Sequence, residues 1–325
     1  RSEVSESCNR NLEKKTAPNE EINFESYFEL LVKSILSSKN PMVLAGGGIR
    51  ASNSLKIFRE LVDRLKIPVV TSLMAIDVLP NSNKYKAGFI GTYGNRWANI
   101  SLSKCDLLIV LGSRLDIRQT GADTVNFSQN KIIFHIDCEK DEINNRVKNC
   151  FSCVSDLKSF FTKFLKYLID NNIIFNESDF IDSIKELERK YPDTEENISD
   201  IGVNPNLLIK KICENNPRFD SFVADVGQHQ MWTAQSIRLN SEQRFITSGG
   251  LGAMGFALPA AIGISFNTKG KVCLISGDSG FQLNIQELET IKRYNLNILI
   301  VILNNNCHGM TRQFQETYFK KDFFL

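Results

Sequence analysis

Two short polar segments follow apolar runs in the second half of the chain. Residues 277–280, Gly-Asp-Ser-Gly, follow the predicted strand 272–275, and residues 304–306, Asn-Asn-Asn, follow the predicted strand 298–303. A helix predicted over 282–294 joins the two strands, so both segments should meet at the carboxyl edge of one parallel sheet. Carboxylate, amide and backbone oxygens suit Mg²⁺, and the glycines let backbone N–H groups approach phosphates. Two ordinary turns would explain either segment alone, but the pair predicts a metal and diphosphate site.

The elements that must position these segments follow from the hydrophobic pattern. In the first part of the chain, apolar strands predicted at 42–44, 68–71, 107–111 and 132–136 alternate with helical periods. From about Asn204, a second set comprises strand 222–224, the glycine-rich segment 249–255 and the strands named above. Nearly continuous apolar strands between helices indicate parallel sheets covered on both faces. We therefore predict an α/β protein with two open, mainly parallel, doubly wound sheets, whose ligands bind where the strands end.

Length and composition limit the classes of function. A chain of 325 residues suggests two domains, and 42% hydrophobic with 23% charged residues is typical of a globular protein. The 39 basic and 37 acidic residues give a net charge of +2, without the excess expected of a nucleic-acid binder. No apolar run approaches the roughly 20 residues of a membrane span. We expect no nucleic-acid or membrane partner.

The eight cysteines lack the regular spacing of a disulfide scaffold, and several lie in predicted core strands. They indicate reduced thiols and a cytoplasmic location. Cys150 and Cys153 form a Cys-x-x-Cys pair, but no second pair or neighbouring histidine supports a zinc or redox site, and two incidental thiols are the favoured interpretation. His135, within an apolar strand, is interpreted as structural.

Several further segments resemble one known family. Residues 227–232 (GQHQMW), 247–256 (TSGGLGAMGF), 284–288 (NIQEL) and 112–121 (GSRLDIRQTG) closely resemble the large catalytic subunit of acetolactate (acetohydroxyacid) synthase, a thiamine diphosphate enzyme. The resemblance runs from about Phe28 to the end of the chain. It implies a transferase of branched-chain amino-acid biosynthesis that decarboxylates pyruvate and adds the two-carbon unit to a second 2-keto acid. It also implies a homodimer or homotetramer, with a regulatory subunit as a further potential partner.

The resemblance assigns roles to single positions. Asp278, Asn305 and the main-chain carbonyl of Cys307 would bind Mg²⁺, and Met254 would lie beneath the thiamine diphosphate and hold it bent. The expected cofactor-binding residues are Gln228, His229, Gly252, Met254, Gly277, Asp278, Ser279, Gly280, Asn305 and Met310. The family's catalytic glutamate belongs to an N-terminal domain that this chain lacks, so no catalytic residue is assigned and these residues alone should not catalyse.

Composition and hydrophobic pattern divide the chain. They predict a linker over 1–25, a first domain over 26–175, a helical and polar linker over 176–204, and a second domain over 205–325. The resemblance implies that these are a middle domain and a diphosphate-binding domain, the latter incomplete at its C-terminal end.

A flavin is the second cofactor that the resemblance raises. Gly46-x-Gly48-x-x-Ala51 formally satisfies a dinucleotide fingerprint, but no acidic residue follows about 20 positions later, which disfavours a nicotinamide dehydrogenase. By resemblance the residues that would contact FAD are Gly46, Gly47, Gly48, Thr71, Leu73, Met74 and Arg114. Related enzymes keep the fold without the flavin, and Arg114 could instead form a surface ion pair with Asp116, so both alternatives stay open.

The acceptor substrate stays open as well. Phe314 stands where acetolactate synthases commonly have tryptophan, at a position that helps to choose the second keto acid. The alternatives are a related thiamine diphosphate-dependent carboligase or decarboxylase with another acceptor, such as a sugar-derived ketone, and a non-catalytic cofactor-binding subunit.

Overall fold

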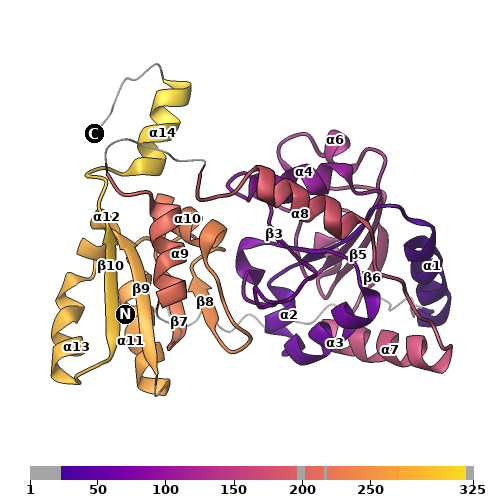
Figure 1. Cartoon of the computed structure of the whole chain (residues 1–325), viewed down its shortest axis with the longest axis horizontal. Coiled ribbons are helices and arrows are strands. Elements are labelled where there is room, and N and C mark those ends of the chain that lie inside the picture. The colour runs from indigo at the N-terminus through magenta and orange to yellow at the C-terminus, as the bar shows by residue number, and fades with distance from the viewer. Residues whose placement is uncertain (1–22, 196–201, 216–217, 269, 320–325) are drawn as a thin grey trace, which may run out of the picture.

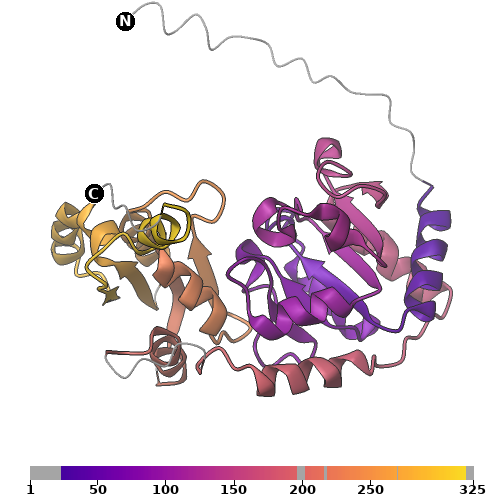
Figure 2. The same ribbon diagram turned by 90° about the horizontal axis from the view of Figure 1, so that it is seen from above.

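The computed structural model describes residues 23–195, 202–215, 218–268 and 270–319, which form two α/β domains lying side by side (Figures 1 and 2). The predicted fold class is confirmed, since each domain contains one open sheet in which every strand pairing is parallel. No described helix is long and apolar enough to span a membrane.

The first domain contains a six-stranded sheet with the order β3-β2-β1-β4-β5-β6. Its strands are β1 (Pro41–Ala45), β2 (Val69–Thr71), β3 (Lys86–Phe89), β4 (Leu107–Leu111), β5 (Ile132–Asp137) and β6 (Phe151–Val154). The order reverses between β1 and β4, and open α/β sheets bind ligands at such a reversal. The first domain therefore has its expected ligand position at the carboxyl ends of these two strands.

Alternate residues of each central strand enter separate cores on the two faces of this sheet. Val43 and Ala45 of β1 join the core that also contains residues of α1 (Phe24–Ser37), α3 (Leu55–Leu65) and α7 (Leu157–Asp170). Met42 and Leu44 join the opposite core, with residues of α4 (Arg96–Lys104) and α8 (Phe180–Lys190). A strand buried on both faces must be apolar at successive positions, which is why β1 is predictable from its sequence.

Helix α8 lies within the predicted linker 176–204. Its Phe180 and Ile184 are buried in the second core of the first domain, and Figure 1 shows the helix running beside α4. The predicted domain bounds remain predictions, and most of the predicted N-terminal linker, residues 1–22, lies outside the described residues. The remaining short helices of the first domain are α2 (Gly48–Ala51), α5 (Ile117–Thr120) and α6 (Thr124–Ser128).

The second domain contains a four-stranded sheet with the order β10-β9-β7-β8. Its strands are β7 (Phe219–Ala224), β8 (Arg244–Thr247), β9 (Lys271–Gly277) and β10 (Ile298–Leu303). One core contains residues of α9 (Pro205–Asn215) and α10 (Gln228–Ser236), and the opposite core contains residues of α11 (Ala257–Asn267). The helix predicted over 282–294 was wrong as one element: the segment forms the end of α12 (Asp278–Gln282), a 3₁₀ turn (Ile285–Glu287) and α13 (Leu288–Arg293). The last described helix is α14 (Gly309–Tyr318).

Candidate functional site

The two polar segments of the second domain meet at the carboxyl edge of its sheet. Strands β9 and β10 pair in parallel with Leu303 opposite Gly277, so Asp278 and Asn305 follow neighbouring strand ends. Strand β7 ends beside them, since the backbone N–H of Asp225 donates to the carbonyl of Ile275 at 2.9 Å. The reversal of strand order in this sheet lies between β7 and β9. The predicted adjacency is therefore observed at the position where such sheets bind ligands.

Asp225 is a site residue that the sequence analysis missed. Its carboxylate is buried and accepts hydrogen bonds from the backbone N–H of Gly255 (3.0 Å) and from the hydroxyl of Ser276 (3.2 Å). A side chain at Gly280 would come within 2.5 Å of the same carboxylate, so this glycine permits the close approach of α12. A lone acidic residue directly after the buried strand 222–224 was the available signal. Asp225 thus connects the glycine-rich segment to the strand ends that are followed by the predicted metal-binding residues.

His229 lies in the first turn of α10 and is buried. Side chains at Gly227, where φ is +153°, or at Gly277 would come within 2.7 and 3.0 Å of its ring. Burial lowers the pKa of His229 to about 4, although the nearby Asp225 carboxylate opposes this shift. The imidazole is therefore neutral near pH 7, and its buried Nε2 makes no hydrogen bond with the described residues. An unpartnered buried ring nitrogen beside the expected diphosphate position is consistent with a ligand at this edge.

Asn305 connects β10 to two helices. Its side-chain NH₂ donates to the Gln228 side chain at 3.1 Å, and its Oδ1 accepts from the backbone N–H of Cys307 at 3.2 Å. Gly309, the first residue of α14, packs so closely on Gln228 that an added Cβ would lie 2.0 Å from its Oε1. Figure 1 shows α14 standing beyond the strand ends of the second sheet. The starts of α10 and α14 are thereby held at the same edge as Asp278.

The donor set at this edge suits a hard divalent cation. Asp278 is half-buried, and its carboxylate makes no hydrogen bond or ion pair with the described residues. No group of three or more His, Cys, Asp or Glu side chains that could hold a metal occurs in the described part of the chain. This finding does not conflict with the expected set, because Asn305 and the Cys307 carbonyl would supply amide and main-chain oxygens. The residues present therefore fit Mg²⁺, whose shell water and phosphate oxygens would complete.

Most of the remaining predicted residues are sequence neighbours of the residues that form this edge. Met254 precedes the Gly255 that bonds Asp225 and is 40% exposed, and Gly252 adopts a φ of +74° within the same segment. Ser279 is half-buried at the start of α12, and Met310 is half-buried at the start of α14. Phe314 lies further along α14, is 54% exposed and packs on Tyr318, with ring centroids 4.8 Å apart. Its other described ring contact is with Phe319, at 5.8 Å between centroids.

A cavity of about 290 Å³ lies at the strand-order reversal of the first domain. This volume is at the lower end of ligand pockets, which are roughly 300 to 1,000 Å³. Five of the seven predicted flavin residues line it, together with Met231, Gly249 and Gly250 of the second domain. The five are Gly47, Gly48, Leu73, Met74 and Arg114.

Gly46 and Thr71, the other two predicted flavin residues, do not line this cavity. An added Cβ at Gly46 would lie 2.0 Å from the carbonyl oxygen of Gly112, so this glycine lets the turn after β1 pack on the end of β4. Thr71 is buried, and its hydroxyl is 3.4 Å from the carbonyl oxygen of Gly88. Both residues have a packing explanation that needs no cofactor.

Arg114 is exposed at the mouth of the cavity and forms no ion pair within the described ranges. Asp116, the partner considered from the sequence, instead caps α5 by accepting from the backbone N–H of Arg118 at 2.8 Å. A guanidinium without an ion pair beside the glycine turn fits the phosphates of a flavin nucleotide. The chemistry of this cavity is therefore compatible with FAD.

His135 and the paired cysteines have structural surroundings. His135 is buried in β5, its Nε2 lies 2.8 Å from the carbonyl oxygen of Ser113, and burial lowers its pKa. Cys150 and Cys153 are buried free thiols whose pKa values burial raises to about 11 and about 12. Thiols with raised pKa values are poor nucleophiles and poor metal ligands.

Comparisons with known proteins find two matching segments of the chain. Residues 28–164 match the family model "Thiamine pyrophosphate enzyme, central domain", and residues 225–324 match "Thiamine pyrophosphate enzyme, C-terminal TPP binding domain". The acetolactate synthase large subunit of Lactococcus lactis subsp. lactis (strain IL1403) is 37% identical over 292 residues, which is 90% of this chain and 50% of that protein.

Two further relatives show the same coverage. The acetolactate synthase large subunit of Porphyra purpurea is 37% identical over 295 residues, covering 89% of this chain and 49% of the relative. The probable acetolactate synthase large subunit of Methanococcus aeolicus is 35% identical over 304 residues, covering 89% and 50%. The chain thus spans about half the length of the curated relatives that it matches.

Proposed function

Because the chain belongs to the thiamine pyrophosphate enzyme family, whose central and C-terminal domains it carries, we propose that it is part of an acetolactate synthase-like carboligase. The enzyme decarboxylates pyruvate and adds the two-carbon unit to a second 2-keto acid, with thiamine diphosphate and Mg²⁺ as cofactors. The observation that carries the proposal is the pairing of β9 with β10, which brings Asp278 beside Asn305. A lone carboxylate next to an amide oxygen is suited to a metal shared with a diphosphate.

Each residue of this edge has a distinct task in the proposal. The Asp278 carboxylate, the Asn305 amide oxygen and the Cys307 carbonyl would hold Mg²⁺, and Gln228 and Ser279 would contact the diphosphate. When bound, thiamine diphosphate supplies the electron sink for the loss of carbon dioxide from a 2-keto acid. Asp225 fixes the glycine-rich segment through Gly255. Met254, the residue before Gly255, would support the cofactor. The protein's part is orientation and electrostatics.

FAD is proposed for the cavity of the first domain. The unpaired Arg114 and the turn at Gly47 and Gly48 support this proposal, since they offer a cation and closely approachable backbone. The relatives are acetolactate synthase large subunits, and we propose that the product of this enzyme serves branched-chain amino-acid biosynthesis.

The proposed assembly is a homodimer or homotetramer, with a regulatory subunit as a further potential partner. Several large apolar side chains beside the candidate site are exposed, which supports a protein partner over this edge. They are Met254, Leu283, Ile285 and Leu288. The free buried thiols support a reducing, cytoplasmic location.

The test is product analysis with the full-length protein. Pyruvate is supplied alone and with 2-ketobutyrate, in the presence of thiamine diphosphate and Mg²⁺, and a parallel reaction contains a chelator. The proposal expects acetolactate from pyruvate, the mixed product when 2-ketobutyrate is added, and neither with the chelator. Decarboxylation without either product would favour another acceptor, in line with Phe314, and no turnover of pyruvate would favour a non-catalytic cofactor-binding subunit.

A further inference from the structure

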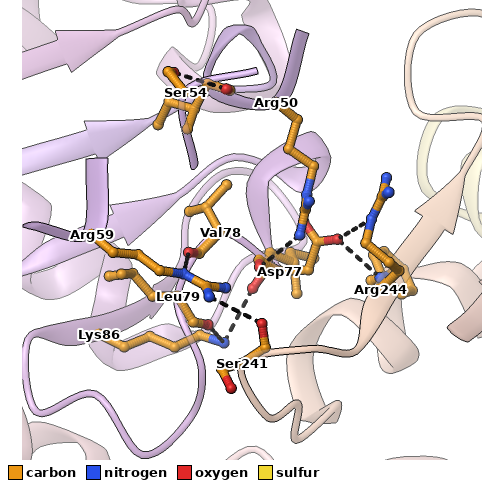
Figure 3. A network of polar contacts seen from close by, with 12 residues as sticks. Arg50, Ser54, Arg59, Asp77, Val78, Leu79, Lys86, Ser241 and Arg244 are labelled. Atoms are coloured by element: carbon orange, nitrogen blue, oxygen red, sulfur yellow. Dashed lines mark hydrogen bonds and ion pairs between the residues drawn. The ribbon is translucent and has the colours of Figure 1, made fainter. Parts of the chain in front are cut away.

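A buried carboxylate joins the two domains. Asp77 follows β2 in the first domain, and its side chain is 2% exposed. One of its oxygens accepts from Arg50 Nε at 2.7 Å, and the other accepts from Arg244 Nε at 3.2 Å and from the backbone N–H of Phe245 at 3.1 Å. Figure 3 shows Asp77 between the two arginines, which come from different domains. The carboxylate is therefore shared between a partner within its own domain and two donors across the boundary.

The loop that carries Asp77 is held firmly. Lys86 Nζ donates to the carbonyl oxygens of Ile76 and Leu79, each at 3.1 Å. Arg59 donates to the carbonyl oxygen of Val78 at 2.9 Å and, across the domain boundary, to that of Ser241 at 3.0 Å. Figure 3 shows these side chains gathered below Asp77. Asp77 is thus a fixed anchor, because the backbone on both sides of it is restrained.

Arg244 and Phe245, the two residues that Asp77 holds across the boundary, begin β8, and β8 leads into the candidate site. Thr247, the last residue of β8, accepts a hydrogen bond from the side chain of Gln230 at 2.6 Å, and Gln230 adjoins His229 in α10. The glycine-rich segment that ends at Gly255 follows β8 directly. The position of β8 therefore bears on both the first turn of α10 and the glycine-rich segment.

Residues close to Asp77 also contact the glycine-rich segment that follows β8. Met74, three residues before Asp77, packs on Gly249, where an added Cβ would lie 2.4 Å from the Met74 sulfur. Residues 73–77 thus touch the second domain both at the start of β8 and just after its end.

We propose that Asp77 is a positioning residue for the diphosphate site of the neighbouring domain. It holds the start of β8 so that Gly255 and His229 take the places that cofactor binding needs, and it touches no cofactor itself. Without the carboxylate, the buried N–H of Phe245 loses its acceptor, and Arg50 and Arg244 are left as unpaired like charges at the boundary. The inference rests on the proposed function, because cofactor binding is the property that the positioning serves.

The experiment compares three variants of the full-length protein. Asp77→Ala removes both contacts across the boundary, and Arg244→Gln removes one of them. Arg50→Gln is the matched control, because it removes an ion pair to the same carboxylate entirely within the first domain. Two quantities are measured: the Kd of thiamine diphosphate with Mg²⁺, and amide hydrogen exchange of residues 245–255 without ligand.

We expect Asp77→Ala to raise the Kd about tenfold, since a buried donor loses its partner. Arg244→Gln should raise it about two- to fivefold, because its side chain is 47% exposed and such pairs are weak. Both variants should speed exchange at Gly255, whereas Arg50→Gln should leave Kd and exchange close to wild type. If Asp77→Ala fails to fold, the comparison of Arg244→Gln with Arg50→Gln tests the proposal in its place.

Equal effects of Arg244→Gln and Arg50→Gln would show a general stabilising role and overturn the proposal, as would wild-type values in every variant. A wild-type protein that binds no thiamine diphosphate would defeat the proposed function instead. In that event the exchange measurement still tests the role of Asp77. Unchanged exchange at Gly255 in the Asp77→Ala and Arg244→Gln variants would overturn the positioning role. Faster exchange in these two variants, but not in Arg50→Gln, would support it.

Discussion

Asp225 and Gly255 are joined by a hydrogen bond of 3.0 Å from the backbone N–H of the glycine to the buried carboxylate. The carbonyl of the same glycine accepts from the Asn284 side chain at 2.8 Å, so the residue is held from both sides. Its φ is +83°, and an added Cβ would lie 2.9 Å from the Asn284 amide nitrogen. The glycine-rich segment can reach the end of β7 in this way only with glycine at this position.

Gly255→Ala should therefore destabilise the protein and weaken thiamine diphosphate binding. The left-handed backbone alone costs an L-residue about 1–2 kcal/mol, and the contact with Asn284 adds to it. Gly263→Ala is the control, because Gly263 lies within α11 and its added Cβ would meet no atom within 4 Å. That change should stabilise the helix by about 0.5–1 kcal/mol. Denaturant unfolding and cofactor titration of both variants provide the measurement, and equal free energies of unfolding would contradict the expectation.

Asp278→Ala should abolish Mg²⁺-dependent binding of thiamine diphosphate. The substitution removes the one carboxylate of the proposed metal site, so the dication would lack a ligand and a compensating negative charge. The rise in Kd should be at least the roughly 10- to 100-fold that removal of an outer-shell partner costs. Calorimetric titration with both cofactors is the test, with Glu289→Ala on the exposed face of α13 as control. Unchanged affinity in Asp278→Ala would remove the metal assignment.

Without ligand, the stability of the protein should depend on the protonation of His229. Burial lowers the pKa of His229 from 6.5 to about 4, so the unfolded chain binds this proton at a higher pH than the folded protein does. The free energy of unfolding should therefore fall as the pH falls from about 6.5 to about 4, by about 3 kcal/mol at most.

The matched variant for this pH dependence is His229→Gln, which retains the buried His135. The difference in unfolding free energy between wild type and His229→Gln should be constant above about pH 6.5 and should change below it. Denaturant unfolding at several pH values gives the two curves. Parallel curves from pH 7 to pH 4 would show that His229 is not held neutral by burial.

Arg114→Ala should release FAD from the full-length protein. The guanidinium is free of ion pairs in the described structure and lines the cavity, so its loss removes a cation from the proposed flavin site. The purified wild type should show flavin absorbance and the variant should not. Arg64→Ala changes an exposed arginine of α3 and should keep the flavin. A colourless wild type that takes up no added FAD would assign the chain to the flavin-free relatives.

The central strands of both sheets were predictable because they are buried on both faces. Strands β1 and β4 are apolar at every position, whereas β6 is buried only at Cys153 and lies at the sheet edge. The edge strands β3, β6 and β8 are short and carry no continuous apolar run, so periodicity did not reveal them. The fourth edge strand, β10, is apolar at every position and was predicted, although none of its residues is fully buried in the described structure. A continuous apolar run is therefore what made a strand predictable, and burial on both faces explains that run in the central strands.

The sequence by itself determined the pairing of Asp278 with Asn305, because one crossover between parallel strands returns the chain to the neighbouring strand end. Only the tertiary structure decided that Asp225 anchors Gly255, that His229 is buried in its neutral form, and that Asp77 holds the start of β8 from another domain. Asp77 and Phe245 are separated by 168 positions, and no local pattern encodes such a contact. Burial and hydrogen bonding arise when distant segments pack together, so spacing along the chain cannot reveal them.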